Sequence, residues 1–167
     1  MTIPEFNALG GDAARAELLR CCGSSRWADG MLRRRPVADK TAALAAADAA
    51  WAETGEQDWL EAFAQHPRIG GKDALRAKFA ATKSWARGEQ AGAAAADEAT
   101  LDALAKGNAD YEARFGFIFI VCATGKSAAE MLALLNARLP DERAPELKIA
   151  AAEQRKITKI RLEKLLT

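Results

Sequence analysis

The chain contains a single histidine, His66, and this residue is the first candidate for acid–base chemistry. It follows residues 59–63, which have the pattern of an amphipathic helix, and it precedes Pro67, which prevents the helix from continuing. We therefore expect His66 at the C-terminal end of a helix, where the negative end of the helix dipole favours the protonated imidazolium. The alternative is a capping or surface histidine without a chemical role.

Glu89 and Gln90 form the second candidate. A carboxylate can serve as a general acid or base, and the neighbouring amide can donate to a polar ligand and accept from it. The alternative is a solvated pair at the start of a helix.

Arg161 is the third candidate, because it interrupts an apolar pattern. Ile157, Ile160 and Leu165 have the spacing of one face of a helix, and Arg161 falls within that face. An arginine that points towards a core needs an anion or several acceptors. Two partners remain open: a structural carboxylate, or a planar ligand whose carbonyl or carboxylate groups the guanidinium binds with two hydrogen bonds.

The cysteine and histidine content argues against a zinc site. The three cysteines are Cys21, Cys22 and Cys122, no C-x-x-C pair is present, and zinc needs about four ligands. Adjacent cysteines are poorly placed to bridge each other. We expect reduced thiols in a cytoplasmic protein with no bound metal.

Charge and hydropathy argue against nucleic-acid and membrane partners. The net charge is +1, and the short basic run 33–35 is typical of a solvated helix end. The Gly70-Gly71-Lys72 turn lacks the spacing of a phosphate-binding loop. No apolar run approaches the roughly 20 residues that span a bilayer.

The elements that must position these residues are predicted to be helices. The chain is rich in Ala, Leu, Glu, Lys and Arg, and its five prolines fall where a helical pattern has stopped or is about to start. Asp12 and Asp39 are candidate N-caps, and Pro145 suits the first turn of the last helix. We predict an all-α fold without significant sheet, as one compact domain over residues 1–167, with about nine helices near 12–22, 25–34, 39–53, 57–65, 72–83, 87–92, 98–114, 126–138 and 145–165.

Two segments are harder to interpret. Residues 91–98 are rich in alanine and are predicted to connect two helices. Residues 117–121, Phe-Ile-Phe-Ile-Val, favour a strand by propensity, but the sequence offers no partner strand. We expect a buried segment, helical or extended, that can present backbone N–H groups to a ligand if it is not fully helical.

Taken together, four ordered motifs make the chain resemble one family along nearly its whole length. That family is 2-oxo-4-hydroxy-4-carboxy-5-ureidoimidazoline (OHCU) decarboxylase. The motifs are His-Pro-Arg-Ile-Gly-Gly-Lys at 66–72, Gly-Glu-Gln-Ala-Gly at 88–92, the segment 108–123, and the C-terminal helix with Ile157, Ile160, Arg161 and Leu162.

The resemblance implies an all-helical, commonly dimeric enzyme that needs no metal or organic cofactor. Such enzymes decarboxylate OHCU to (S)-allantoin and CO2, which completes the route from urate. By resemblance, His66 is the catalytic acid or base and Glu89 is its partner. The same resemblance assigns substrate binding to Pro67, Gln90, Arg161 and backbone groups of Phe119, Ile120, Val121, Cys122 and Ala123.

The chain departs from the family pattern at Ala86, where the family often has a serine that would line the substrate site; Ser84 lies two residues earlier. If that hydroxyl only orients substrate, its loss costs roughly 0.5–1.5 kcal/mol. The departure leaves one alternative open, a non-catalytic helical protein that binds a related ureide or purine metabolite. A second alternative is a helical interaction protein whose histidine and inward arginine are structural.

Overall fold

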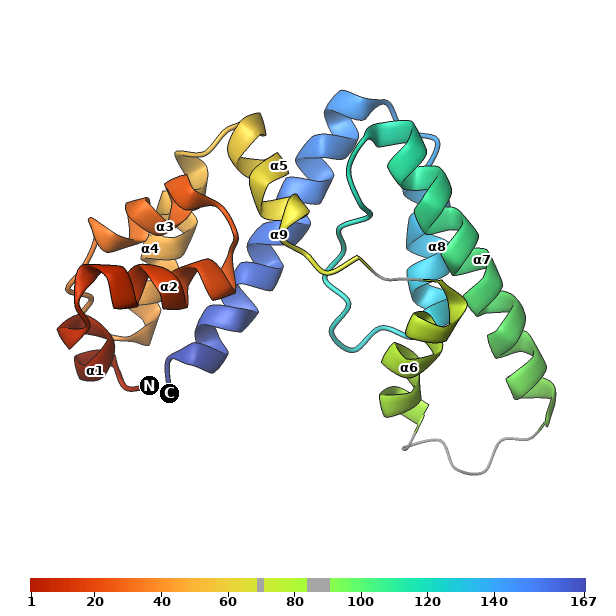
Figure 1. Cartoon of the computed structure of the whole chain (residues 1–167), viewed down its shortest axis with the longest axis horizontal. Coiled ribbons are helices and arrows are strands. Elements are labelled where there is room, and N and C mark those ends of the chain that lie inside the picture. Colours follow the sequence, from red (N-terminus) through yellow and green to blue (C-terminus); the bar gives the residue numbers. More distant parts are fainter. Residues whose placement is uncertain (69–70, 84–90) are drawn as a thin grey trace. The chain divides into compact units, whose positions relative to one another are not determined.

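The computed structural model describes residues 1–68, 71–83 and 91–167, with side chains omitted at 80–83 and 91–97. Within these ranges all regular secondary structure is helical, so the predicted all-α class is confirmed (Figure 1). The helices are α1 (Ile3–Ala8), α2 (Gly11–Cys21), α3 (Ser25–Leu32), α4 (Lys40–Ala52), α5 (Glu56–Ala64), α6 (Lys72–Lys83), α7 (Ala91–Phe115), α8 (Ala128–Arg138) and α9 (Arg143–Leu165).

The chain divides into two compact units. The first contains residues 1–66, 120–122 and 147–167, and the second contains residues 67–119 and 123–146. Helix α9 therefore begins in the second unit and contributes most of its length to the first.

Helix α3 is central to the first unit and packs against α2, α4 and α5. Its Trp27 is fully buried, and the indole Nε1 donates to the carbonyl of Ala47 on α4 at 3.1 Å. Gly30 permits the close crossing of α3 and α4, since a Cβ there would lie 3.1 Å from Cβ of Ala50. The two termini meet in this unit, where the amide of Thr167 donates to the carbonyl of Met1 at 2.9 Å (Figure 1).

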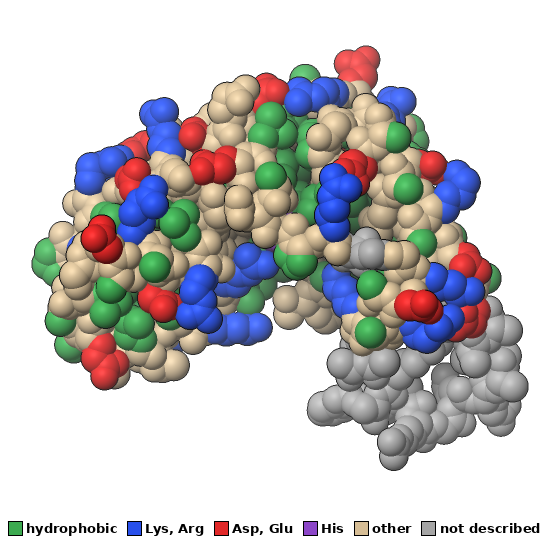
Figure 2. Space-filling view, in the orientation of Figure 1, with side chains coloured by type: hydrophobic (Ala, Val, Ile, Leu, Met, Phe, Trp, Pro, Cys, Tyr) green, Lys and Arg blue, Asp and Glu red, His purple; other side chains and the backbone are tan. Residues whose placement is uncertain are grey.

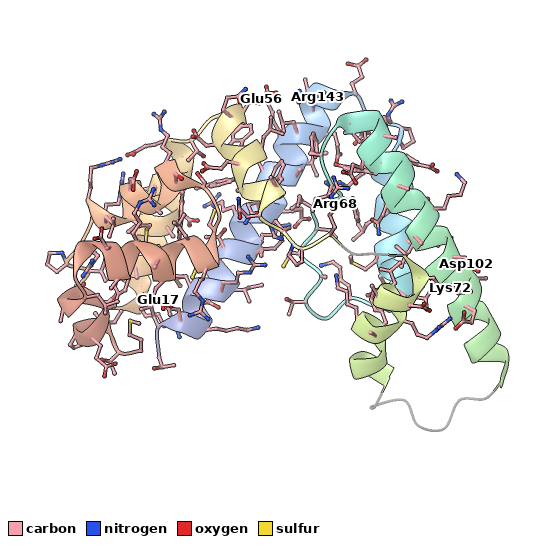
Figure 3. The ribbon with its side chains drawn as sticks, viewed as in Figure 1. Glu17, Glu56, Arg68, Lys72, Asp102 and Arg143 are labelled. Carbon is pink, nitrogen blue, oxygen red and sulfur yellow. The ribbon has the colours of Figure 1, made fainter. Side chains whose placement is uncertain are left out.

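Helix α7 forms the backbone of the second unit, with α8 and α6 packed along it. Gly107 allows α8 to approach closely, because a Cβ at this position would meet Cδ2 of Leu135 at 2.4 Å. Between α6 and α7, Lys72 lies 3.0 Å from the carboxylate of Asp102 (Figure 3). The fit of α7 to its neighbours thus combines a small residue with an exposed ion pair.

Helix ends follow the capping chemistry of the sequence at some positions and not at others. Asp39 caps α4 as predicted, accepting from the amide of Ala42 at 2.7 Å. The prediction for Asp12 was wrong, because α2 starts earlier, after Gly10, and Asp12 lies in its first turn. Pro145 lies in the first turn of α9, as predicted.

Two helices differ from the predicted set. Helix α1 was not predicted, although Thr2 and Glu5 form a capping box at its start. The connection predicted for residues 91–98 was also wrong, because α7 already begins at Ala91. Alanine has the highest helix propensity of all residues, so an alanine run continues a helix unless a breaker ends it. Most of the short helix predicted for 87–92 lies outside the described residues.

Residues 116–127 connect α7 to α8 without helix or strand. Gly116 ends α7 with φ of 81°, and Gly125 makes a second turn with φ of 75°, a region that favours glycine. Ser127 then caps α8 by accepting from the amide of Glu130 at 3.2 Å. The strand-like run 117–121 is therefore neither strand nor helix, which leaves its backbone groups for other partners.

Acidic and basic side chains are interspersed over the described surface in Figure 2, in agreement with the near-neutral net charge. Among the described helices, none combines the length and the apolar character that a bilayer crossing requires.

Candidate functional site

His66 lies directly beyond the end of α5, as predicted. Gln65 is the C-cap of this helix, and the amide of His66 closes a last turn by donating to the carbonyl of Phe63 at 3.2 Å. Phe63 is buried in the first unit and anchors the helix end. The imidazole itself is half-buried, so packing restrains the ring without enclosing it.

The imidazole contacts a residue that the sequence analysis did not identify. Nε2 of His66 lies 2.5 Å from Oε1 of Gln154 on α9. Gln154 is fully buried, and its Nε2 donates to Oγ1 of Thr158 at 3.1 Å. The buried stripe of α9 runs through these two polar residues, together with Leu147, Ala150, Ala151 and Leu162.

The apolar face predicted from Ile157, Ile160 and Leu165 was therefore wrong, because all three are only half-buried. Gln154 and Thr158 are polar but occupy core positions, so the spacing of apolar residues alone does not reveal the buried face of α9. A search for helical spacing that allowed uncharged polar residues would have found the stripe.

The segment Ile120–Cys122 is buried in the first unit beside the same part of α9. The amide of Cys122 donates to Oε2 of Glu153 at 3.4 Å. Glu153 precedes Gln154, so His66 and this segment meet consecutive residues of one helix. The structure thus brings His66 and one of the predicted backbone donors to the same turn of α9.

Arg161 follows Gln154 by seven residues, or about 10 Å along the helix, on nearly the same face. Its guanidinium is half-buried, and Nη1 donates to the carbonyl of Cys21 at 3.4 Å, a long hydrogen bond. Burial raises the pKa of the Cys21 thiol to about 11, with the nearby Arg161 acting in the opposite direction. The arginine therefore contacts a backbone acceptor within a unit that also holds His66.

The remaining described candidates belong to the second unit. Pro67 is exposed, while Phe119 and Ala123 are half-buried. The Phe119 ring lies edge-on to Tyr111, with 5.2 Å between centroids, and the Arg138 guanidinium carbon is 4.7 Å from its centroid. These contacts hold one end of the connecting segment in place.

A buried charge pair supports that aromatic cluster. Glu146 is fully buried and accepts from Arg138 at 2.7 Å through Nε. The Tyr111 hydroxyl also donates to Glu146. Burial raises the pKa of Tyr111, so the phenol keeps its proton and remains a donor.

Three candidates, Ala86, Glu89 and Gln90, lie outside the described residues, as does Ser84. Within the described part of the chain, no group of three or more His, Cys, Asp or Glu side chains is arranged to hold a metal ion.

Comparison with known proteins decides the family. The family model described as OHCU decarboxylase matches residues 7–163. The chain belongs to the OHCU decarboxylase family. The match covers both units and every candidate residue, so the resemblance inferred from the four motifs is confirmed.

Two curated relatives of this OHCU decarboxylase family member have names that refer to urate breakdown or to OHCU. It is 41% identical over 150 residues to the uric acid degradation bifunctional protein TTL of Arabidopsis thaliana, covering 88% of this chain and 45% of that protein. It is 37% identical over 106 residues to an OHCU decarboxylase of Amia calva, covering 60% of this chain and 57% of that protein. The chain thus spans about half the length of these relatives.

Two solved structures share the fold. A crystal structure of an OHCU decarboxylase in the presence of (S)-allantoin superposes with a TM-score of 0.70 at 38% identity, covering 89% of this chain and 96% of the other. An (S)-allantoin synthase has a TM-score of 0.71 at 17% identity, covering 99% of this chain and 54% of the other, and this likeness concerns the fold alone.

Proposed function

We propose that this protein decarboxylates OHCU to (S)-allantoin and CO2. One observation carries the proposal: the chain aligns with 96% of a solved OHCU decarboxylase at 38% identity, and that protein was crystallised in the presence of (S)-allantoin. The names of the relatives, an OHCU decarboxylase and a uric acid degradation protein, point to the same reaction.

His66 and Glu89 are the proposed catalytic pair. The reaction requires a base or acid for the substrate hydroxyl and a proton delivered to one face of the ring carbon. His66 is the chain's one imidazole, and it is the side chain with the most suitable ordinary pKa for both tasks. Glu89 would stabilise the charged form of the imidazole through its negative charge.

Arg161, Gln90 and backbone amides are proposed to bind the substrate and to stabilise the charge that develops on its ring. When CO2 leaves, its electron pair flows into the adjacent ring C=N, and preorganised donors lower the energy of that state. Cys122 offers one such amide, which donates to Oε2 of Glu153 at 3.4 Å in this structure. Pro67, Phe119, Ile120, Val121, Ala123 and Ala86 are proposed to line the same site.

The reaction is proposed to need no cofactor, because the substrate supplies its own electron sink. A metal chelator should then leave the turnover rate unchanged. We further propose a homodimer that acts in the cytoplasm as a single catalytic domain. The three buried cysteine thiols, none of them in a disulfide, are compatible with a reducing compartment.

The alternative function is ureide or purine-metabolite binding without turnover, favoured by Ala86 at the position where the family often has serine. A coupled assay separates the two functions. Urate oxidase and hydroxyisourate hydrolase generate OHCU in place, and its disappearance is followed by absorbance with and without this protein. A rate well above spontaneous decay supports the decarboxylase, whereas spontaneous decay in the presence of folded protein supports the binding function.

A further inference from the structure

Gln154 is buried beside the imidazole of His66 in a chain of hydrogen bonds that continues to Thr158. Oε1 of Gln154 lies 2.5 Å from Nε2 of His66, and Nε2 of Gln154 lies 3.1 Å from Oγ1 of Thr158. Both residues of α9 are buried, with relative exposures of 0% and 3%. A glutamine in a core without such partners would be costly, so each polar atom here must be matched with a donor or an acceptor.

The hydroxyl of Thr158 determines which way the Gln154 amide points. This hydroxyl has one proton, and it donates that proton to the carbonyl of Gln154, one helical turn earlier, at 2.9 Å. Its oxygen can therefore only accept from the Gln154 side chain, which requires the NH2 group on that side. The amide oxygen then faces His66.

The thiol of Cys22 also hydrogen-bonds to the Thr158 hydroxyl. This contact does not change the orientation assigned to the Gln154 amide. Burial raises the pKa of the Cys22 thiol, so the sulfur keeps its proton. The threonine proton lies on the Gln154 carbonyl, 2.9 Å away, so the neutral thiol can meet Oγ1 only as a donor.

The orientation of the amide fixes the proton on the imidazole. Because Oε1 of Gln154 only accepts, Nε2 of His66 must carry hydrogen in both the neutral and the protonated ring. The neutral ring is then the Nε2–H tautomer, and its lone pair lies on Nδ1.

We propose that Gln154, oriented by Thr158, is a positioning residue that holds His66 as the Nε2–H tautomer, so that proton exchange with the substrate takes place at Nδ1. When the ring acts as a base, an O–H bond of the substrate breaks, its electron pair stays on oxygen and an Nδ1–H bond forms. When it acts as an acid, the Nδ1–H bond breaks, its electron pair stays on Nδ1, and the proton forms a C–H bond at the substrate ring carbon. The inference rests on the proposed catalytic role of His66.

The tautomer can be measured without substrate, because the chain has one histidine. Full-length protein labelled with 15N-histidine gives imidazole signals from His66 alone in long-range proton–nitrogen spectra. The expected result for the neutral ring is a single Nε2–H tautomer whose Nε2 proton exchanges slowly with water. In Gln154→Leu that proton should exchange quickly, and the two tautomers should average.

Kinetics tests the consequence for the reaction. Gln154→Leu should lower kcat by about tenfold or more, with a much smaller change in KM, because ring orientation matters most in the transition state. Thr158→Val removes the hydroxyl that orients the amide. It should therefore also speed exchange of the Nε2 proton and lower kcat, each to a smaller extent than Gln154→Leu. Thr158→Ser keeps the hydroxyl and should restore the wild-type tautomer and kcat, which a purely structural role would not predict.

Two results would overturn the proposal. One is an Nδ1–H tautomer in the wild type. The other is a folded Gln154→Leu or Thr158→Val protein that keeps the slow Nε2 proton and the wild-type kcat. A failure of the proposed function would be recognised differently, as a wild-type protein with the expected Nε2–H signal and no turnover of OHCU.

Discussion

Gly23 lies so close to Gln65 that a Cβ atom on the glycine would be 2.4 Å from Cγ and 2.5 Å from Cβ of the glutamine. Gln65 is the C-cap of α5 and directly precedes His66. The turn between α2 and α3 therefore supports the end of the helix that presents the imidazole.

Gly23→Ala should displace this helix end. The clash involves Cβ of Gln65, which a change of rotamer cannot move, so we expect a loss of about 1–3 kcal/mol in the free energy of unfolding. We also expect kcat to fall, because His66 shifts with the cap. Gly11→Ala is the matched control, since a Cβ at Gly11 has no heavy atom within 4 Å. Equal urea midpoints and turnover for the two variants would contradict this account.

Arg161→Lys should weaken substrate binding without unfolding the protein. Lysine keeps the charge but cannot form two parallel hydrogen bonds to a planar ligand, so KM should rise by about tenfold or more. The bond from Arg161 to Cys21 is long at 3.4 Å, so stability should change by less than about 1 kcal/mol. Arg155→Lys, on the same helix, is the control and should keep its KM. A KM unchanged in both variants would remove Arg161 from the substrate site.

Arg138→Met should destabilise the second unit strongly. It would leave the carboxylate of Glu146 buried beside Tyr111 without a counter-charge, a change that typically costs about 3–5 kcal/mol. The double variant Arg138→Met/Glu146→Leu should recover most of this loss. Lys106→Met breaks an exposed ion pair with Asp110 and should cost no more than about 1 kcal/mol. Denaturant titrations measure the free energy of unfolding of each variant. Equal losses for Arg138→Met and Lys106→Met would contradict the claim that the buried ion pair matters more than the exposed one.

Asp48 should make the stability of the first unit depend on pH. Hydrogen bonds from Arg155 and then Lys159 outweigh partial burial and lower the pKa of Asp48 to about 2. A carboxyl group with a lowered pKa stabilises the fold above its unfolded pKa, near 4, and loses that contribution as the pH falls towards 2.

Asp48→Asn should therefore reduce stability by about 1 kcal/mol at pH 7, a value that allows for solvent screening of a partly exposed pair. The difference from wild type should shrink between about pH 4 and pH 2. Thermal melts of both proteins at several pH values measure this difference in stability. A difference that stayed constant down to pH 2 would show that loss of the Asp48 carboxylate does not cause it.

The sequence predicted the helical class and the place of His66 well, because both depend on local signals. Pro67 stops the preceding helix in any context, and Ala-rich, Pro-poor segments form helices by propensity alone. The capping by Asp39 is equally local.

The features that sequence analysis missed depend on tertiary contacts. Helical spacing could have placed Gln154 and Thr158 on the buried face of α9, but their burial is tolerated because their polar atoms bond to His66, Cys22 and each other, and the sequence does not show these partners. The conformation of Phe119 likewise depends on Arg138 and Tyr111, which come from other parts of the sequence. The start of helix α7 was missed for another reason. The alanine-rich residues before Leu101 have a high helix propensity, so the local sequence favours the helix that the structure shows there.

The formation of optically active allantoin tests the central claim most directly. OHCU is generated in place by urate oxidase and hydroxyisourate hydrolase, and circular dichroism follows the product with wild-type protein, with His66→Asn and without protein. We predict rapid appearance of (S)-allantoin with the wild type, unchanged by a metal chelator, and a large loss of rate with His66→Asn. Slow, racemic product with folded wild-type protein would contradict the decarboxylase assignment, and equal rates for the wild type and His66→Asn would contradict the role given to His66.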